Sequence, residues 1–227
     1  MPRSARIVIP HVLHHITQRG NRKEVVFFDD EDRLYFRDRL QFYSSRAGLG
    51  LALDCLMDNH THLLAVPEHK ESFEMTFKPL HMQYSQYLNK KFGRSGVNWQ
   101  GRYFSSPLDD SHAWNAFEYV ALNPVRAQLS QSLDLYKWSS AKALLTGAPD
   151  PLLTADLKWL RMGRLAISEI LKSPNFVPDQ EAFRQIATLT LKNLPIGSES
   201  FIAELESQTG RVLRPKPMGR PPKKKSE

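Results

Sequence analysis

The sequence predicts an α+β fold: an antiparallel, ferredoxin-like split βαβ sheet with helices on one face, followed by a small helical C-terminal appendage. The first observation is the order of hydrophobic patterns, which is strand, helix, strand, strand, helix, strand and helix. That order is the ferredoxin-like arrangement with one added helix. The second observation is a change after residues 147–151, beyond which the periodicity is helical. We therefore expect a main domain at residues 1–148, a helical region at 149–212 and a flexible basic tail at 213–227.

The strands are predicted from apolar and β-branched runs that stop at turn residues. They lie at residues 11–20, 51–56, 60–66 and 98–108. The second and third strands form a hairpin, because Asp58 and Asn59 between them favour a turn.

The helices are predicted from apolar spacing and from their end signals. The first begins at the acidic run of residues 29–32, which suits a helix N-terminus, and ends by Gly48 or Gly50. Ser111 is the expected N-cap of the third helix. The other five helices are predicted at residues 71–92, 112 to about 129, 153–172, 179–193 and 199–208.

The composition describes an ordinary globular chain of 227 residues, with 24% charged and 41% hydrophobic residues. No apolar run approaches the roughly 18 residues of a membrane span. The N-terminus lacks the apolar core of a secretion signal. The single cysteine, Cys55, excludes an intrachain disulfide and a cysteine-rich zinc site, and it is expected to pack as a small hydrophobe. These features fit a reducing, cytoplasmic compartment.

The net charge of +7 comes mainly from the C-terminal tail. Residues 211–225 contain seven of the 31 Lys and Arg residues and no acid. Such a tail binds polyanions through phosphate contacts, and the alternative is a merely solvated end. The segment GRPPKKK also has the pattern of a minor-groove AT-hook, although a generic phosphate tether is the simpler interpretation. The candidate DNA-binding residues in the tail are Arg220, Lys223, Lys224 and Lys225.

The segment DCLMDNHTHLLAVP, residues 54–67, holds the most informative pair of residues. In a β-strand alternate side chains leave the same face, so His60 and His62 are expected to lie side by side while Thr61 points to the opposite layer. Two imidazoles so placed can hold one divalent metal ion if a third ligand arrives from elsewhere. The alternative is a pair of surface histidines without a metal.

The helix after the fourth strand contains EYVALNPVRA, residues 118–127. Tyr119 and Asn123 are four residues apart and share one helix face, unless Pro124 ends the helix before it. A tyrosine hydroxyl needs a nearby base or metal to become a nucleophile, and the Asn123 carbonyl oxygen is a candidate third metal ligand. The alternative role of Tyr119 is packing. Its rivals as nucleophile, Tyr84 and Tyr87, have the spacing of core residues.

Further basic and aromatic residues are candidates for contact with DNA. Trp99 is a candidate for stacking on a base or, alternatively, for the core. The cations expected to contact phosphate are Arg19, Arg22, Lys23, Arg102 and Arg126. For Arg102 and Arg126 the alternative is a structural role.

These motifs together resemble the REP-associated tyrosine transposases, relatives of the single-tyrosine HUH transposases. The resemblance covers nearly the whole chain in the expected order, except that Thr61 stands where the family has a hydrophobic residue. The segments that carry it are HHITQRGNR, MDNHTHLLAVP, NWQGRYF, EYVALNPVRA and the region at residues 195–221.

The resemblance implies a DNA endonuclease and strand transferase that acts on single-stranded DNA with short palindromic repeat hairpins. It implies that residues 1–148 form an HUH-type catalytic domain in which Tyr119 is the nucleophile of a 5′-phosphotyrosine intermediate. It also implies Mg²⁺ or Mn²⁺ held by His60, His62 and Asn123. We expect a nucleoid-associated monomer, with a dimer as the alternative. The competing functions are a DNA-binding module of the same fold without catalysis and a metallohydrolase using Asp58.

Overall fold

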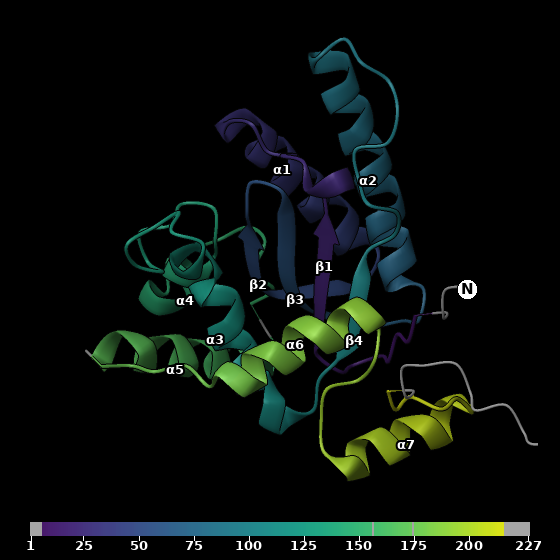
Figure 1. The fold of residues 1–227 in the computed structure, drawn as a ribbon, viewed down its shortest axis with the longest axis vertical. Coiled ribbons are helices and arrows are strands. Elements are labelled where there is room, and N and C mark those ends of the chain that lie inside the picture. Colours follow the sequence, from purple (N-terminus) through teal and green to yellow (C-terminus); the bar gives the residue numbers. More distant parts are fainter. Residues whose placement is uncertain (1–5, 156, 174, 216–227) are drawn as a thin grey trace, which may run out of the picture.

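The centre of the fold is a four-stranded antiparallel sheet with the strand order β2-β3-β1-β4 (Figure 1). The structure is a computed structural model that describes residues 6–155, 157–173 and 175–215. Its strands are β1 (His14–Arg19), β2 (Leu49–Leu56), β3 (His60–Pro67) and β4 (Phe104–Pro107). The order and the connections are those of the predicted ferredoxin-like split βαβ sheet, so the predicted fold class is confirmed.

The described helices comprise a short 3-10 turn and seven α-helices. They are η1 (Asn21–Lys23), α1 (Asp30–Arg46), α2 (Ser72–Lys91), α3 (Asp110–Arg126), α4 (Ala141–Thr146), α5 (Lys158–Lys172), α6 (Gln180–Lys192) and α7 (Glu199–Thr209). The short helix α4 is the α-helix that the sequence did not predict.

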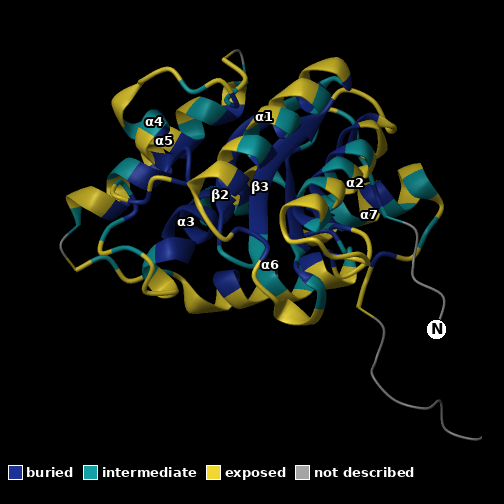
Figure 2. Cartoon of the chain, turned by 90° about the horizontal axis from the view of Figure 1, so that it is seen from above, coloured by how far each residue is buried: buried dark blue, intermediate teal, exposed yellow. Residues whose placement is uncertain are grey.

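The two faces of the sheet are covered by different helices, as alternate residues of β1 show. The ring of His14 packs edge-on against Phe73 of α2, with 5.0 Å between centroids. The ring of the next residue, His15, packs edge-on against Tyr119 of α3 at 5.6 Å. The two βαβ helices α1 and α2 therefore lie on one face, and α3 lies on the other. The central strands are buried between these layers (Figure 2).

The layer of α1 and α2 contains an aromatic core. The rings of Phe27, Phe36, Tyr84 and Trp99 contact one another there, with centroids 5.2 to 6.4 Å apart. Only 6% of Trp99 is exposed, so this side chain is a core residue, not a platform for a base. Cys55 is also buried, and burial raises the pKa of its thiol, which fits its expected packing role.

The fourth strand is shorter than predicted. It begins at Phe104 and leaves the preceding residues 98–103 as a loop. Gly101 has φ 73°, in the left-handed region, and this conformation interrupts an extended strand. Arg102 and Tyr103 therefore lie in a loop beside the sheet and not in the sheet.

Helix α3 begins earlier than predicted. Its N-cap is Asp109, whose carboxylate accepts a hydrogen bond from the backbone N–H of His112, so the prediction of Ser111 was wrong. Aspartate caps a helix as well as serine does, and its charge also suits the positive end of the helix dipole. Pro124 lies inside the helix and does not end it. Tyr119 and Asn123 therefore share one continuous helix, as expected.

The edge of β4 that faces away from β1 is covered by the segment that follows α6. The backbone N–H of Ser105 donates to Oδ1 of Asn193 over 3.1 Å, and the N–H of Ile196 donates to the carbonyl of Pro107 over 2.9 Å. The hydroxyl of Ser106 donates to the carbonyl of Leu194. These bonds satisfy part of an edge strand and fix the C-terminal end of α6 on the sheet. Figure 1 shows α6 crossing the sheet between α3 and β4.

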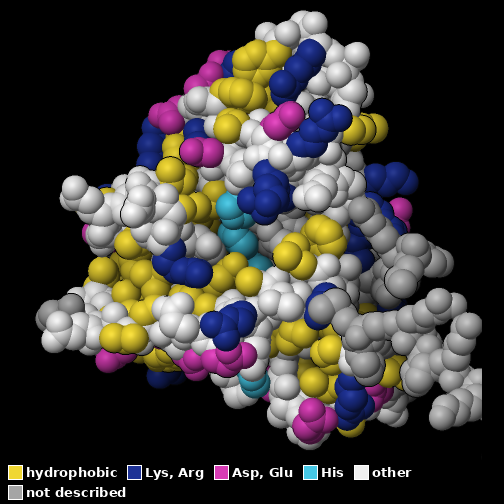
Figure 3. All heavy atoms as spheres, in the orientation of Figure 1, with side chains coloured by type: hydrophobic (Ala, Val, Ile, Leu, Met, Phe, Trp, Pro, Cys, Tyr) yellow, Lys and Arg dark blue, Asp and Glu magenta, His cyan; other side chains and the backbone are white. Residues whose placement is uncertain are grey.

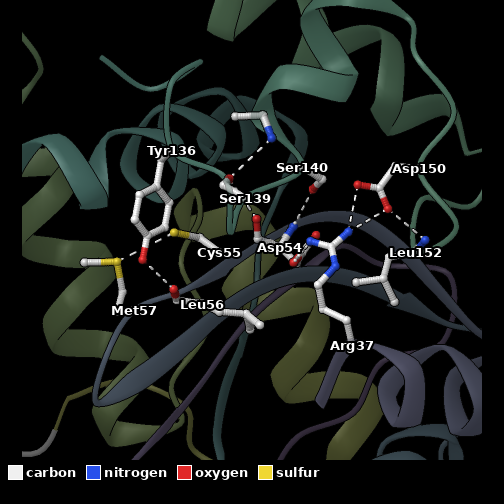
Figure 4. A network of polar contacts seen from close by, with 11 residues as sticks. Arg37, Asp54, Cys55, Leu56, Met57, Tyr136, Ser139, Ser140, Asp150 and Leu152 are labelled. Atoms are coloured by element: carbon white, nitrogen blue, oxygen red, sulfur yellow. Dashed lines mark hydrogen bonds and ion pairs between the residues drawn. The ribbon is translucent and has the colours of Figure 1, made fainter. Parts of the chain in front are cut away.

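A buried ion-pair network joins α1, β2 and the loop before α5 (Figure 4). Arg37 donates to Asp54 and to both carboxylate oxygens of Asp150, each over 2.8 Å. Burial raises the pKa of Asp54, and the guanidinium of Arg37 opposes that rise. Breaking such a pair leaves an uncompensated buried charge, so Arg37 ties the loop at residues 148–154 to the sheet.

The packed part of the chain continues slightly beyond the predicted start of the tail. Leu213 is buried in a small cluster with Ile7 and Leu205. Arg214 forms ion pairs with Glu199 and Glu206. The predicted DNA-binding residues Arg220, Lys223, Lys224 and Lys225 lie outside the described residues. None of the described helices is long and apolar enough to cross a membrane.

The buried side chain of His14 should make the folded protein less stable in acid. Its ring is fully buried. Nδ1–H donates to the carbonyl of Val12 over 2.8 Å, and Nε2 accepts a hydrogen bond from the N–H of Ile9 over 3.2 Å. Burial lowers the pKa of His14 from 6.5 to about 4. The unfolded chain therefore takes up a proton on this residue at a higher pH than the folded chain does. Stability from this group is complete above pH 6.5 and is lost as the pH falls from 6.5 toward 4.

We expect His14→Gln to remove roughly 2 kcal/mol of the stability difference between pH 7 and pH 5. Urea unfolding at both pH values measures this difference. The exposed substitution Thr188→Val, which removes no titratable group, is the control and should leave the pH dependence unchanged. Equal pH dependence in wild type and His14→Gln would contradict this account.

Candidate active site

The face of the sheet opposite α1 and α2 carries a cleft of about 480 Å³. Figure 3 shows histidine side chains in a hollow of this surface, with basic side chains around it. Strands β1 and β3 form the floor, and α3 and α6 contribute to the walls. The lining residues are His15, Thr17, Arg19, Lys23, His60, His62, Gln100, Phe104, Tyr119, Ala187, Thr190 and Leu191.

His60 and His62 lie side by side on β3, as strand alternation requires. Their ring centroids are 4.8 Å apart. Asn59 orients the first ring: its Nδ2 donates to the carbonyl of Lys23 over 2.9 Å, so its Oδ1 faces Nδ1 of His60 at 2.6 Å. Because an amide oxygen only accepts, Nδ1 of His60 carries the proton and Nε2 keeps its lone pair.

His62 has a different neighbour, His15 of β1. Nδ1 of His62 lies 2.9 Å from Nε2 of His15, and Nδ1 of His15 lies 2.8 Å from the hydroxyl oxygen of Thr190 on α6. His15 is fully buried, and His62 is 5% exposed. Three residues from distant parts of the sequence thus form a buried polar line that ends in the cleft.

The three cleft histidines are uncharged at neutral pH. Desolvation by burial is the main cause: it lowers the pKa of His60 to about 4 and that of His15 to about 3, and it lowers the pKa of His62 well below 6.5. The nearby cationic and imidazole groups act in the same direction. The rings therefore keep their lone pairs for hydrogen bonds or for a metal ion.

The described lining of the cleft offers a metal ion the imidazoles of His60 and His62 but no carboxylate. Among the residues that the structure describes, no group of three or more His, Cys, Asp or Glu side chains is arranged to hold a metal ion. Two neutral nitrogens suit Mn²⁺ better than Mg²⁺, which prefers oxygen. A metal ion held by His60 and His62 would therefore need further oxygen ligands.

Tyr119 reaches the cleft from α3 and packs edge-on against His62, with 5.5 Å between ring centroids. Phe183 of α6 packs edge-on against its other side at 5.3 Å. The guanidinium of Arg126, about two helical turns further along α3, lies 5.4 Å from the centroid of the Tyr119 ring and 5.1 Å from that of Phe183. Burial raises the pKa of the Tyr119 hydroxyl, and the charge of Arg126 is the chief opposing influence.

Asn123 lies one turn beyond Tyr119 on the same helix. Its Nδ2 donates to the carbonyl of Tyr119 over 2.9 Å, and its amide also favours the ionised phenol of Tyr119. Asn123 does not belong to the lining of the histidine cleft. Its assignment as the third metal ligand remains a prediction.

The family of the chain follows from comparison of its sequence with protein-family models. The model of transposases described as IS200-like matches residues 8–123, which is half of the chain and includes the histidines and Tyr119. The chain belongs to the IS200-like transposase family. Comparison with curated proteins finds no match.

Two solved structures are similar to this transposase. The first is described as the REP-associated tyrosine transposase bound to a REP hairpin; it has 13% identity and a TM-score of 0.51, with 69% of this chain and 93% of that chain covered. The second is a candidate transposase from Deinococcus radiodurans R1, with 19% identity, a TM-score of 0.36 and coverage of 57% and 94%. The first likeness shows the fold. The resemblance predicted from the motifs is therefore confirmed for family and fold.

The rival residues of this transposase lie elsewhere. Tyr84 is fully buried and donates to the carbonyl of Val26 over 2.6 Å, and Tyr87 donates to Asp32 over 2.9 Å, both in the layer of α1 and α2. Asp58, the candidate acid of a metallohydrolase, is engaged by Arg33. Of the three tyrosines, Tyr119 is the one that lines the histidine cleft.

The predicted phosphate-binding residues of the described chain lie in different places. Arg19 and Lys23 line the histidine cleft, and Arg126 lies above Tyr119. Arg102 lines a different cavity of about 390 Å³ together with Arg6 and Lys78. Arg22 is exposed on η1 and belongs to neither lining.

Sequence reasoning missed His15, Phe183 and Thr190. The alternation of β1 could have indicated His15, because it leaves the same strand face as Arg19, which was predicted to contact DNA. Phe183 and Thr190 belong to α6, and no local pattern of that helix indicates which surface it covers.

The hydroxyls of Tyr119 and Tyr84 should differ in their contribution to stability. Tyr84→Phe leaves the buried carbonyl of Val26 without its partner and should lower the free energy of unfolding by about 1–2 kcal/mol. Tyr119→Phe keeps the ring packing and should change it by less than about 0.5 kcal/mol. Urea unfolding at pH 7 measures both. A larger loss for Tyr119→Phe than for Tyr84→Phe would identify Tyr119 as a structural residue.

Proposed function

We propose that this transposase cleaves and rejoins single-stranded DNA that carries short palindromic hairpins, through a covalent 5′-phosphotyrosine on Tyr119. The observation that carries the proposal is the packing of Tyr119 against His62 in an open cleft with a basic rim. A tyrosine beside two uncharged imidazoles has the elements of metal-assisted phosphoryl transfer. The family match supports the same class of reaction.

The proposed chemistry is a pair of transesterifications. The Tyr119 oxygen bonds to the scissile phosphorus while the bond to the 3′ oxygen of the upstream nucleotide breaks. The phenol proton leaves to water and the departing 3′ oxygen takes up a proton, which gives a 5′-phosphotyrosine and a free 3′-OH. In the second step a 3′-OH attacks the phosphotyrosine, restores a phosphodiester and returns the tyrosine. The two steps conserve the number of phosphoester bonds, so no external energy source is needed.

The residues of the cleft divide the remaining tasks. Arg126 places a positive charge beside the developing phenolate, which offsets the cost of ionising a buried tyrosine. His60 and His62, with Asn123 as the expected third ligand, would hold Mg²⁺ or Mn²⁺. A bound metal ion would polarise a non-bridging phosphate oxygen.

The proposed partner is a DNA hairpin with an adjoining single strand. Arg19 and Lys23 supply positive charge at the cleft rim. The fold neighbour described as bound to a REP hairpin supports a hairpin as the partner. We propose that the protein acts on the nucleoid in the cytoplasm as a monomer.

A second candidate function is a hairpin-binding module without catalysis. The observation that favours it is the cover over Tyr119, which is only 7% exposed and lies beneath Phe183 and Arg126. In that case DNA would bind the basic rim without reaching the phenol.

We expect Tyr119→Phe to abolish a covalent protein–DNA adduct while hairpin binding stays within about twofold, because the substitution removes only the attacking oxygen. The measurement uses 3′-end-labelled hairpin oligonucleotides made from palindromic repeats of the source genome, incubated with Mn²⁺ and separated on a denaturing gel. The label stays with the strand that carries the 5′-phosphotyrosine.

Tyr87→Phe is the matched control and should form the adduct at the wild-type level. An adduct that persists in Tyr119→Phe would sink the assignment of the nucleophile. If wild type binds the hairpins and forms no adduct on any of them, the binding-module function replaces the catalytic one.

The rim cations should account for part of the salt dependence of DNA binding. The double substitution Arg19→Ala with Lys23→Ala should weaken hairpin binding and reduce the slope of log K against log salt by about 1.4 to 1.8. Fluorescence anisotropy at several salt concentrations measures the slope. Lys172→Ala at the end of α5 is the control and should not change it. Equal slopes in the double variant and wild type would place the DNA path elsewhere.

A further inference from the structure

His15 and Thr190 are the two buried residues of the cleft that the proposed chemistry leaves without a role. The rings of His15 and His62 have an interplanar angle of 11° and centroids 5.1 Å apart, while their facing nitrogens are 2.9 Å apart. The centroid separation is nearly that of two rings lying edge to edge in one plane. Each ring therefore directs a nitrogen at the other ring, which is the geometry of a hydrogen bond.

An uncharged imidazole has one N–H donor and one acceptor nitrogen, so the bonds can run in two directions. In one direction the Thr190 hydroxyl donates to His15, and His15 donates to His62. In that direction Nδ1 of His62 is the acceptor, so the proton of His62 lies on Nε2. Nε2 then has no lone pair for a metal ion. In the other direction Nδ1–H of His62 donates to His15, and Nδ1–H of His15 donates to Thr190. Only the second direction leaves a lone pair on Nε2 of His62.

We propose that His15 is a positioning residue which, together with Thr190 of α6, holds His62 as the Nδ1–H tautomer and keeps Nε2 ready for a metal ion. The inference rests on the proposed metal-dependent function and adds the means by which one ligand is oriented. Histidines that bind metals commonly donate their second N–H to a fixed acceptor, and loss of that acceptor weakens the metal site. For His60 the acceptor is Asn59; for His62 it is His15.

The role of Thr190 follows from how α6 is fixed. Its hydroxyl oxygen lies 2.8 Å from Nδ1 of His15, three residues before Asn193, which with Leu194 bonds to β4. Phe183 at the other end of the helix packs on Tyr119. Thr190 lies beyond the part of the chain that matches the family model, which ends at residue 123. The C-terminal helical region therefore supplies part of the active-site support.

The first test measures Mn²⁺ affinity of the full chain without DNA, by electron paramagnetic resonance of the free ion. His15→Leu should weaken Mn²⁺ binding by about 10- to 100-fold, because His62 loses its acceptor. Thr190→Val should weaken Mn²⁺ binding by at least about threefold, because His15 loses the hydroxyl that accepts its Nδ1–H and no longer holds His62 in one tautomer. His15→Gln offers an amide oxygen in place of Nε2 and should restore part of the affinity.

Two substitutions separate this role from packing. Thr190→Ser keeps the hydroxyl and should bind Mn²⁺ within about twofold of wild type. Thr188→Val on the same helix is exposed and should do the same. If His15→Leu does not fold, Thr190→Val against Thr190→Ser carries the test. Wild-type affinity in Thr190→Val or in folded His15→Leu overturns the proposal.

The second test observes the tautomer directly and needs no metal ion. Long-range ¹H–¹⁵N spectra of the histidine-labelled full chain, with His62 assigned from a His62→Gln sample, should show His62 protonated at Nδ1. In Thr190→Val the His62 signals should shift toward a mixture of both tautomers. His62 protonated at Nε2 in wild type overturns the proposal. A wild-type chain that has the Nδ1–H tautomer but neither binds Mn²⁺ nor forms an adduct would instead refute the proposed function and leave the orientation of His62 supported.

Discussion

The antiparallel register between β1 and β3 is the constraint on which the site depends. It sets Thr17 opposite His62 and Arg19 opposite His60, so one sheet face receives the two histidines, His15 and a basic residue together. The Thr17 hydroxyl donates to the carbonyl of Thr61 over 2.8 Å and adds a side-chain bond across this pairing. A slip of one residue would turn both histidines toward the aromatic layer beneath α1 and α2, where they would meet no tyrosine nucleophile.

The second requirement is the cover provided by α6. Phe183, Thr190 and Asn193 contact three different parts of the site: Tyr119, His15 and the edge strand β4. A helix held at three points cannot move without disturbing at least one of them. The burial that α6 imposes also raises the pKa of Tyr119 and lowers those of the histidines. The appended helical region and the sheet therefore act as one site, although they are separate in the sequence.

The sequence predicted the parts of the site that depend on local periodicity. The spacing of His60 and His62 gave their common strand face, and the spacing of Tyr119 and Asn123 gave their common helix face. The position of α6 depends on tertiary contacts of Asn193 and Phe183 that no periodicity encodes, so Thr190 was missed. The start of the fourth strand was also missed, because the local pattern does not indicate the left-handed conformation of Gly101.

The charge of the cleft bears on when a metal ion would be held. None of its described lining residues is acidic, whereas Arg19 and Lys23 are basic. A divalent cation would thus join two neutral imidazoles within a positive field, so its affinity for the protein alone should be lower than its affinity for the complex with DNA. A phosphodiester brings the negative charge and the oxygen ligands that the protein lacks. In the proposed mechanism, metal and DNA therefore stabilise each other in the cleft, and a precisely oriented His62 matters most because so few protein ligands hold the ion.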